Sequence, residues 1–490
     1  MTTSPSPRPA RALRGLPAAL RVLAVLALAL LSPACGEGAG GPPVTPTVDN
    51  GPRGRRPPPP SAAGATPERP HIIVISVDTL RRDHVGFHGY ERRTTPALDE
   101  LAKYSIVFER AYTAFSWTLV AHMTLLTGLH PSQHGVYHAE STLPDGVPTL
   151  ASRLRQAGYH TMGFHDSKWL EPRYGYDRGF TVYARHHGAR QAGEHMARAL
   201  AERPKDRPFF LFMHLMDAHN APLGEGSTMY APPEPFDSIF VPDAVEKVAG
   251  LDMAELWKRG ADQLTPEQRE ALVALYDGGI RYVDTKLGEW IKTWWGVGLM
   301  DNAVLVITSD HGEGLAQRQP GYGGHGYVYE EGLRVPMIMH LPKHLRAGER
   351  VDDPVTHVDL VPTLLQLAGL EDDGRLPGRP LLRPREDAVV YSEQPDRIES
   401  FLRWPWKLVR KVDGGGQRLY NLEQDPHEAM PVESGTPAWD ERRDITDAFT
   451  RRVEAERAGW YRPSSPAQAA PLTEEEQAEL RSLGYLGEDP

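Results

Sequence analysis

The sequence predicts a doubly wound α/β fold, with a mostly parallel central sheet and a small antiparallel subdomain near the C-terminal end. Three aliphatic and aromatic runs carry this prediction, at residues 71–77, 209–213 and 303–307. Apolar runs without a polar alternation are typical of strands buried on both faces, as in parallel sheets. Helical segments separate the runs, and strand–helix alternation favours a doubly wound sheet.

Each run ends on acidic residues or histidines. Asp78 follows the first run, Asp217 and His219 follow the second, and Asp310 and His311 follow the third. Ligands of open α/β sheets bind at the carboxyl ends of the strands. A charge at a buried strand end must be paired or coordinated. We therefore expect these side chains to form a metal site at one edge of one sheet.

Capping signals mark the predicted helices. Thr95 followed by Pro96 suits the N-cap and first position of a helix. Residues 147–158 form a second predicted helix, which ends on glycine. Thr265 and the glutamine three residues later form a capping box before a long amphipathic helix that runs towards Trp290.

After about Leu370 the pattern changes to short strands, at 389–391, 406–409 and 418–420. The Asp-Gly-Gly-Gly sequence at 413–416 is typical of a hairpin turn between two of them. These features predict the antiparallel subdomain.

The N-terminal segment predicts export. Arginines precede an apolar stretch at 22–31, which is too short to span a bilayer but fits a signal peptide. The residues before Cys35 resemble a bacterial lipoprotein signal, although Ser32 stands where leucine is usual. Acylation of Cys35 would anchor the protein to a bacterial membrane, and an ordinary cleaved signal would secrete it. Both interpretations place the protein outside the cytoplasm.

Four segments are expected: a signal peptide at 1–35, a Pro/Gly-rich tether at 36–70, a catalytic domain at 71–370, and a C-terminal subdomain with a terminal helix at 371–490. A net charge of -11 argues against a nucleic-acid partner. Cys35 is the single cysteine, which excludes an intramolecular disulfide and a cysteine-based zinc site.

Short motifs follow one another along most of residues 71–425. They lie at 77–81, 125–128, 210–214, 217–219, 308–313, 334–336, 359–363 and 419–425. In this order and spacing they resemble the sulfatase family of the alkaline-phosphatase-like superfamily. The resemblance implies an alkaline-phosphatase-like fold and a metal-dependent hydrolase of a sulfate or phosphate ester.

The nucleophile position departs from the family pattern. Sulfatases convert a Cys or Ser in the pattern Cys/Ser-x-Pro-x-Arg to formylglycine. Counting back from 125–128, this position falls on Thr118, with Val120 in place of Pro and His122 in place of Arg, while Ser116 is out of register. Other superfamily members use a metal-bound threonine on phosphoesters, so the resemblance favours Thr118 as nucleophile and a phosphoester as substrate. The alternative is that Thr118 caps a helix without chemistry.

The metal ligands that the resemblance implies are Asp78, Asp310 and His311, with the Thr118 hydroxyl completing the set. Typical sulfatases carry a second Asp where this chain has Thr79, and an Asn where it has His311. An imidazole favours Zn²⁺ or Mn²⁺ over Ca²⁺ or Mg²⁺, which remain open.

Four further side chains are candidates for catalysis. His219 matches the family histidine that contacts the ester, and His325 follows His311 at an interval similar to that in phosphoethanolamine transferases. Lys168 resembles a lysine that neutralises the anionic group, and His122 could replace the missing arginine. The alternatives are an exposed loop histidine for His325 and a surface lysine for Lys168. Asp217 could orient His219, join a second metal site, or make a structural hydrogen bond.

The sequence thus predicts a hydrolase that acts on an anionic ester of a small molecule, glycan or lipid. Two other functions remain open. One is a transferase of a phospho-head-group, although such enzymes usually carry several membrane helices. The other is a binding protein on a hydrolase scaffold, which would not need to keep the metal-ligand set.

Overall fold

A computed structural model gives the fold of the chain. It describes residues 69–219, 230–251, 264–315, 326–383, 388–394, 397–459, 461–463, 468–469, 471–474 and 477. The predicted signal peptide with Cys35, the predicted tether up to residue 68, and His325 lie outside these residues, as does most of the predicted terminal helix. Residues 70–490 belong to one compact unit.

A nine-stranded sheet forms the centre of this unit. The strands follow the order β10-β2-β8-β7-β1-β6-β4-β5, with β9 paired to β2. Among the described strands only β8 runs antiparallel to its neighbours, so the sheet is mixed but mostly parallel, as predicted. The strands are β1 (His71–Val77), β2 (Ile106–Tyr112), β4 (His160–His165), β5 (Val182–Arg185), β6 (Phe209–Leu215), β7 (Ala303–Thr308), β8 (Arg334–His340), β9 (Arg350–Val351) and β10 (Val355–Thr356).

The three predicted apolar runs are the three central strands. β1 lies between β6 and β7 and is parallel to both. Ser76 of β1 is in register with His214 of β6 and with Thr308 of β7, so the strands end together. The residues that follow them therefore meet at one edge of the sheet, as the sequence predicted.

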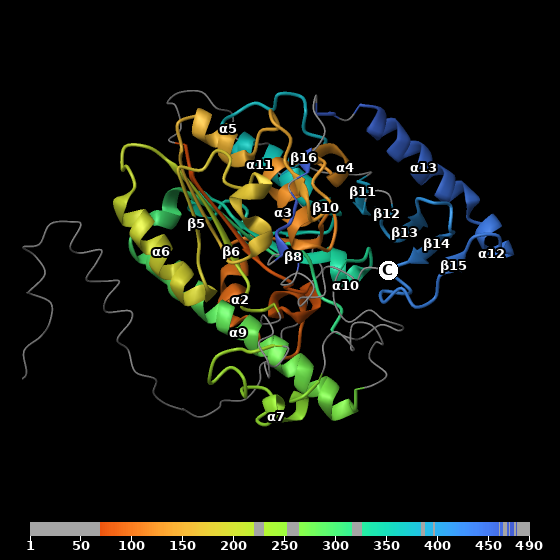
Figure 1. Ribbon diagram of the computed structural model, residues 1–490, viewed down its shortest axis with the longest axis horizontal. Helices are drawn as coiled ribbons and strands as arrows, with labels where there is room; N and C mark the ends of the chain where they lie inside the picture. Colours follow the sequence, from red (N-terminus) through yellow and green to blue (C-terminus); the bar gives the residue numbers. More distant parts are fainter. Residues whose placement is uncertain are drawn as a thin grey trace, which may run out of the picture. The chain divides into compact units, whose positions relative to one another are not determined.

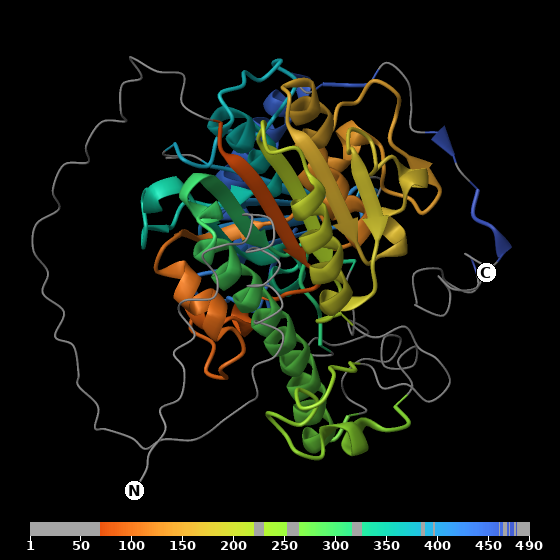
Figure 2. The ribbon, with the colours of Figure 1, turned by 90° about the vertical axis from the view of Figure 1, so that its left-hand side faces the viewer.

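Helices cover both faces of the sheet (Figure 1). Ile73, Ile75 and Val77 pack with α2, α6, α7 and α9 on one face, while Ile72 and Val74 pack with α3, α5 and α11 on the other. Figure 2 shows α6 and α9 in front of the strands that they cover. The helices are α2 (Pro96–Ala102), α3 (Thr118–Thr127), α5 (Leu150–Gln156), α6 (Gly188–Glu202), α7 (Ala244–Val248), α9 (Pro266–Gly296) and α11 (Leu360–Leu367).

The predicted helix starts are largely confirmed. Thr95 is the N-cap of α2, and Thr265 forms the capping box of α9, which continues past Trp290 to Gly296. The predicted helix at 147–158 begins later, at Leu150, because Thr149 accepts a hydrogen bond from the amide of Ser152 and acts as its N-cap.

The C-terminal part adds a five-stranded sheet in the order β11-β12-β13-β14-β15, and all of its pairs are antiparallel. The predicted turn at 413–416 joins β13 to β14. The elements are β11 (Val390–Gln394), β12 (Ile398–Arg403), β13 (Trp406–Lys411), β14 (Gln417–Asn421), β15 (Val432–Glu433), α12 (Pro437–Asp440) and α13 (Arg443–Ala458). Other short elements are β3 (Ser141–Thr142), β16 (Gln468–Ala469), α4 (Pro131–His134) and α10 (Glu330–Leu333). Among the described residues, none of the helices has the length and apolar character needed to cross a bilayer.

Candidate metal-dependent active site

Thr118 lies at the start of α3, with its side chain turned into the site. Trp117, not Thr118, is the N-cap, and it makes no side-chain capping bond. The Thr118 hydroxyl lies 3.3 Å from Asp78 Oδ2 and 3.3 Å from His311 Nε2. The hydroxyl therefore contacts two of the predicted metal ligands. Thr118 is not the helix cap that the alternative interpretation expected.

The two aspartates of the site are fully buried, each with 0% exposure. Asp78 Oδ2 accepts a hydrogen bond from His214 Nε2 at 2.9 Å. Asp310 Oδ1 accepts from the amides of Thr79 at 3.2 Å and His311 at 2.9 Å. Among the described residues, Asp78 Oδ1 and Asp310 Oδ2 have no hydrogen-bond partner. Buried carboxylate oxygens without a partner are costly, so this pair fits a bound cation.

The backbone at Thr79 is strained, with φ at 55°. A left-handed conformation is unfavourable for a β-branched residue by roughly 1–2 kcal/mol. Tyr276 donates a hydrogen bond to the Thr79 carbonyl at 2.6 Å and so stabilises this turn. In this conformation the Thr79 amide points at Asp310, and the strain serves to hold one carboxylate oxygen in place.

The tautomer of His311 follows from its contacts. Nδ1 lies 2.8 Å from the carbonyl oxygen of Gly312, which can only accept, so Nδ1 carries the proton. In the neutral ring Nε2 then presents a lone pair to Asp310 Oδ2 at 3.3 Å and Asp78 Oδ1 at 3.9 Å. A lone pair facing two carboxylates is repulsive unless a positive charge lies between them. The donor set of two carboxylates, an imidazole and the Thr118 hydroxyl thus fits a divalent cation.

The two carboxylates have opposite pKa shifts. Burial and the neighbouring Asp78 raise the pKa of Asp310 well above its usual value. Burial also acts to raise the pKa of Asp78, but His219, His214 and His311 outweigh it and lower this pKa. Two acidic groups this close cannot both ionise easily without added positive charge, which is the charge that a cation would supply.

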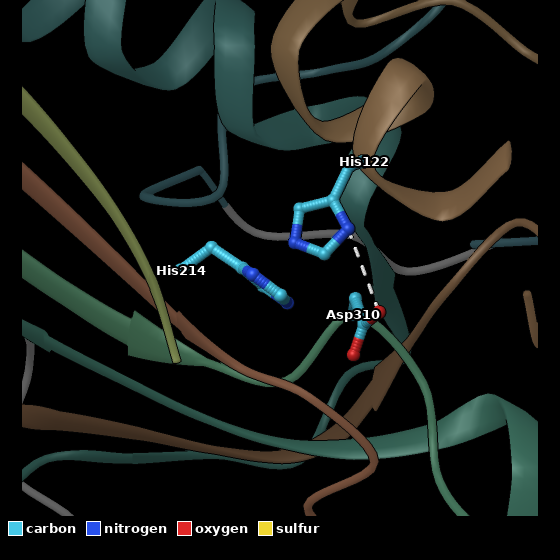
Figure 3. A group of neighbouring side chains, drawn as sticks. All are labelled: His122, His214 and Asp310. Carbon is cyan, nitrogen blue, oxygen red and sulfur yellow. Dashed lines mark ion pairs between the residues drawn. The ribbon is translucent and has the colours of Figure 1, made fainter. Parts of the chain in front are cut away.

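His122, His214 and Asp310 form a second group with metal-ligand spacing among the described residues (Figure 3). His122 Nδ1 lies 3.0 Å from the Thr118 carbonyl, so it carries the proton, and it lies 3.5 Å from Asp310 Oδ2. Its Nε2 therefore accepts from the Ser76 hydroxyl at 3.0 Å. Burial lowers the pKa of His122 well below its usual value, and the ring is neutral at physiological pH.

The nitrogens of His214 are also engaged. Nδ1 lies 3.3 Å from the amide of Asp166, which donates to it, so Nε2 carries the proton that Asp78 accepts. Both imidazoles of this second group are thus used in hydrogen bonds within the protein. In the group formed by Asp78, Asp310 and His311, the ligand atoms lie within 4.8 Å of one another. Each of its two carboxylates keeps one oxygen, Asp78 Oδ1 or Asp310 Oδ2, without a hydrogen-bond partner among the described residues.

The other candidate residues lie around this centre. His219 follows β6, is 5% exposed, and is close enough to Asp78 to lower its pKa. Lys168 begins a short 3₁₀ helix, Lys168–Leu170, which packs against α3. The rings of Trp117 and Trp169 meet there at 5.0 Å. The catalytic roles of His219, Lys168, His122 and His325 stay predictions.

Asp217 has a structural contact. Its carboxylate accepts from the amide of Ala189 at 2.9 Å and so caps the start of α6. This is the structural alternative of the three that the sequence left open. His134 and His357, which we interpret as structural, hydrogen-bond to Thr124 at 3.2 Å and Thr308 at 3.1 Å.

Sequence reasoning gave no role to His214 or Ser76. Both lie in strands whose residues are mostly apolar, and both are 0% exposed. The available signal was the strand register, because a polar residue at the end of a central strand adjoins the residue that follows the next strand.

Comparisons with known proteins give the family of the chain. A family model described as Sulfatase matches residues 70–370, and one described as N-sulphoglucosamine sulphohydrolase, C-terminal, matches residues 321–457. A Delta 4,5-hexuronate-2-O-sulfatase of Bacteroides thetaiotaomicron is 25% identical over 412 residues, which cover 75% of this chain and 85% of the relative. The human N-sulphoglucosamine sulphohydrolase is 26% identical over 413 residues, which cover 77% of each.

The fold is also found in a solved structure, the phosphonate monoester hydrolase of Agrobacterium radiobacter. It superposes with a TM-score of 0.63 at 21% identity, covering 80% of this chain and 96% of that one. The matching family model, which spans more than half of the chain, shows that this protein belongs to the sulfatase family of hydrolases, which act on sulfate or phosphate esters.

Proposed function

We propose that this sulfatase-family hydrolase cleaves a phosphoester with Thr118 as its nucleophile. The observation that carries the proposal is the Thr118 hydroxyl, 3.3 Å from both Asp78 Oδ2 and His311 Nε2. Formylglycine chemistry needs a Cys or Ser at this position, and the chain has threonine.

Asp78, Thr118, Asp310 and His311 would hold a divalent cation, with Zn²⁺ or Mn²⁺ favoured by the imidazole. A cation in this set would lower the pKa of the Thr118 hydroxyl and offset the charge of the two aspartates. Neighbouring backbone groups orient the residues that would bind the cation. The amides of Thr79 and His311 hold Asp310, and the Gly312 carbonyl fixes the His311 tautomer.

The reaction we propose has two displacements at phosphorus. Thr118 Oγ forms a bond to phosphorus as the bond to the leaving oxygen breaks, and the hydroxyl proton passes to a base of the site. His219 would donate a proton to the leaving oxygen. Water then attacks phosphorus of the phospho-threonine and gives a proton to His219, the bond from phosphorus to Oγ breaks, and the base returns its proton to Thr118 Oγ.

The threonine also supports a phosphoester over a sulfate ester. A formylglycine hydrate expels sulfate by elimination through its second hydroxyl. A threonine sulfate has no second hydroxyl on the same carbon, so it must be hydrolysed by direct attack at sulfur. The family includes sulfatases that act on glycans, so we propose a phosphoester borne by a glycan or a small molecule. For location we propose the outside of the cytoplasm, on the basis of the export signal and Cys35.

The test compares an aryl phosphodiester, an aryl phosphonate monoester and an aryl sulfate on the zinc- or manganese-loaded protein. We expect turnover of the phosphorus esters and little of the sulfate. Thr118→Val should reduce kcat by at least about 10³-fold at unchanged fold, because it keeps the shape and removes the nucleophile. Thr118→Ser should keep part of the activity.

Intact-mass measurement during turnover should detect a phosphoryl adduct in the wild type and none in Thr118→Val. Activity on the sulfate alone would overturn the phosphoester assignment. Equal rates for wild type and Thr118→Val would overturn the nucleophile.

A further inference from the structure

His214 adjoins the proposed metal site, with Nε2 2.9 Å from Asp78 Oδ2. It is near the end of β6 and is 0% exposed, so it cannot contact bulk water. Its backbone is held as well, because the His214 carbonyl accepts from His186 Nε2 at 2.9 Å. The ring therefore occupies one fixed place next to Asp78.

The two ring nitrogens of His214 have different and fixed partners. The amide of Asp166 can only donate, so Nδ1 of His214 accepts from it at 3.3 Å. Nε2 consequently carries the proton and donates to Asp78 Oδ2 at 2.9 Å. His214 is thus a neutral donor that points at one oxygen of one carboxylate.

This contact decides which oxygen of Asp78 is presented to the site. Oδ2 receives His214 and the Thr118 hydroxyl, whereas Oδ1 has no hydrogen-bond partner among the described residues. Oδ1 is also the Asp78 atom that lies 3.9 Å from His311 Nε2. Without the donor, the carboxylate could rotate about its terminal torsion, which is soft for aspartate.

We propose that His214 is a positioning residue. Its hydrogen bond to Oδ2 holds the Asp78 carboxylate, in the metal-free protein, in the orientation that leaves Oδ1 available to the cation. The proposal rests on the metal set of the proposed function, but it does not depend on the nucleophile or on the substrate. Donors that orient ligand groups typically change metal affinity by roughly 10- to 100-fold when they are removed.

Two polar variants separate this role from simple packing. In His214→Gln the amide nitrogen can take the place of Nε2 and still donate to Asp78. In His214→Asn the side chain reaches only the place of Nδ1, so it keeps the contact with Asp166 and loses Asp78. His340→Asn is the matched control, since His340 is a buried histidine at the end of β8 whose Nδ1 bonds to Tyr104.

The measurement is the zinc dissociation constant of the full chain, by competition with a chromogenic chelator. We expect His214→Asn to bind zinc roughly 10- to 100-fold more weakly than wild type, with His214→Gln and the control within a few-fold of it. Equal affinities for His214→Asn and His214→Gln would overturn the positioning role. If the wild type itself bound no divalent cation, the proposed metal set would fail, and this inference with it.

Discussion

A single imidazole sets the expected metal preference. The resemblance to sulfatases places His311 where they usually carry an oxygen ligand, and its Nε2 lies 3.3 Å from Asp310 Oδ2 and 3.9 Å from Asp78 Oδ1. His311→Gln would place an amide at about the position of Nε2, and its oxygen could face the cation. Because oxygen ligands suit Ca²⁺ and Mg²⁺, we expect this variant to bind zinc more weakly while its preference for calcium over zinc rises. Elemental analysis after equilibration with equal concentrations of both ions checks this. An unchanged zinc-to-calcium ratio would show that His311 is not a ligand.

For single residues, the sequence was informative where a charged or metal-binding residue type stands at the end of an apolar strand. Asp78, Asp310 and His311 interrupt apolar runs, so their convergence could be predicted from strand ends alone. His214 could not be assigned in this way, because its role depends on a register and on which nitrogen carries the proton. Thr79 was recognised as a departure from the family pattern. Its left-handed backbone could not be predicted, because a β-branched residue rarely adopts a positive φ.

Among the elements, α3 shows why sequence patterns fail close to the site. All of its 10 residues are buried, so it lacks the polar face by which an amphipathic helix is recognised. By contrast α9 has an N-terminal capping box and partly exposed residues, and its start was predicted correctly. The helix that begins with Thr118 was therefore harder to predict than the helix that covers the sheet.

Ser116, which precedes α3, forms hydrogen bonds with Gly326 and Tyr327. Ser116 Oγ accepts from the amides of Gly326 at 3.0 Å and Tyr327 at 2.7 Å, and the Ser116 carbonyl accepts from Gly326 at 2.7 Å. Ser116→Ala would leave two half-buried amides with fewer acceptors, at a cost of about 0.5–1.5 kcal/mol, the net contribution of a typical hydrogen bond. We expect a lower Tm and a reduced kcat at unchanged metal content, because this contact joins two elements of the site. The control is Ser105→Ala, which removes the hydroxyl of a buried serine bonded to Leu101 at the end of α2. A kcat equal to that of wild type would show that the contact is only structural.

On the scale of the whole molecule, a buried ion network joins the two sheets. Lys407 of β13 is 1% exposed and pairs with Glu428 at 2.8 Å and with Glu330 of α10 at 3.1 Å. Tyr112 of β2 donates to Glu330 at 3.0 Å. The C-terminal sheet is thus attached to the central one by charge as well as by apolar packing, in agreement with one compact unit. The sequence predicted both sheets but not this junction, since a lysine within a short strand ordinarily faces water.

This network makes stability depend on pH, because two carboxylates share one ammonium. Burial raises the pKa of Glu428 from 4.5 to about 7, with Lys407 opposing the shift and Glu330 adding to it. Between these values the folded protein keeps a proton that the unfolded chain has lost, so the free energy of unfolding falls as pH rises across this window and levels off above it. The Glu428→Gln variant has no titratable side chain at this position. From pH 5 to pH 8 we therefore expect the stability of Glu428→Gln to rise relative to wild type, by on the order of 2 kcal/mol. Calorimetric Tm values at several pH values check this, and parallel profiles for the two proteins would show that Glu428 is ionised throughout.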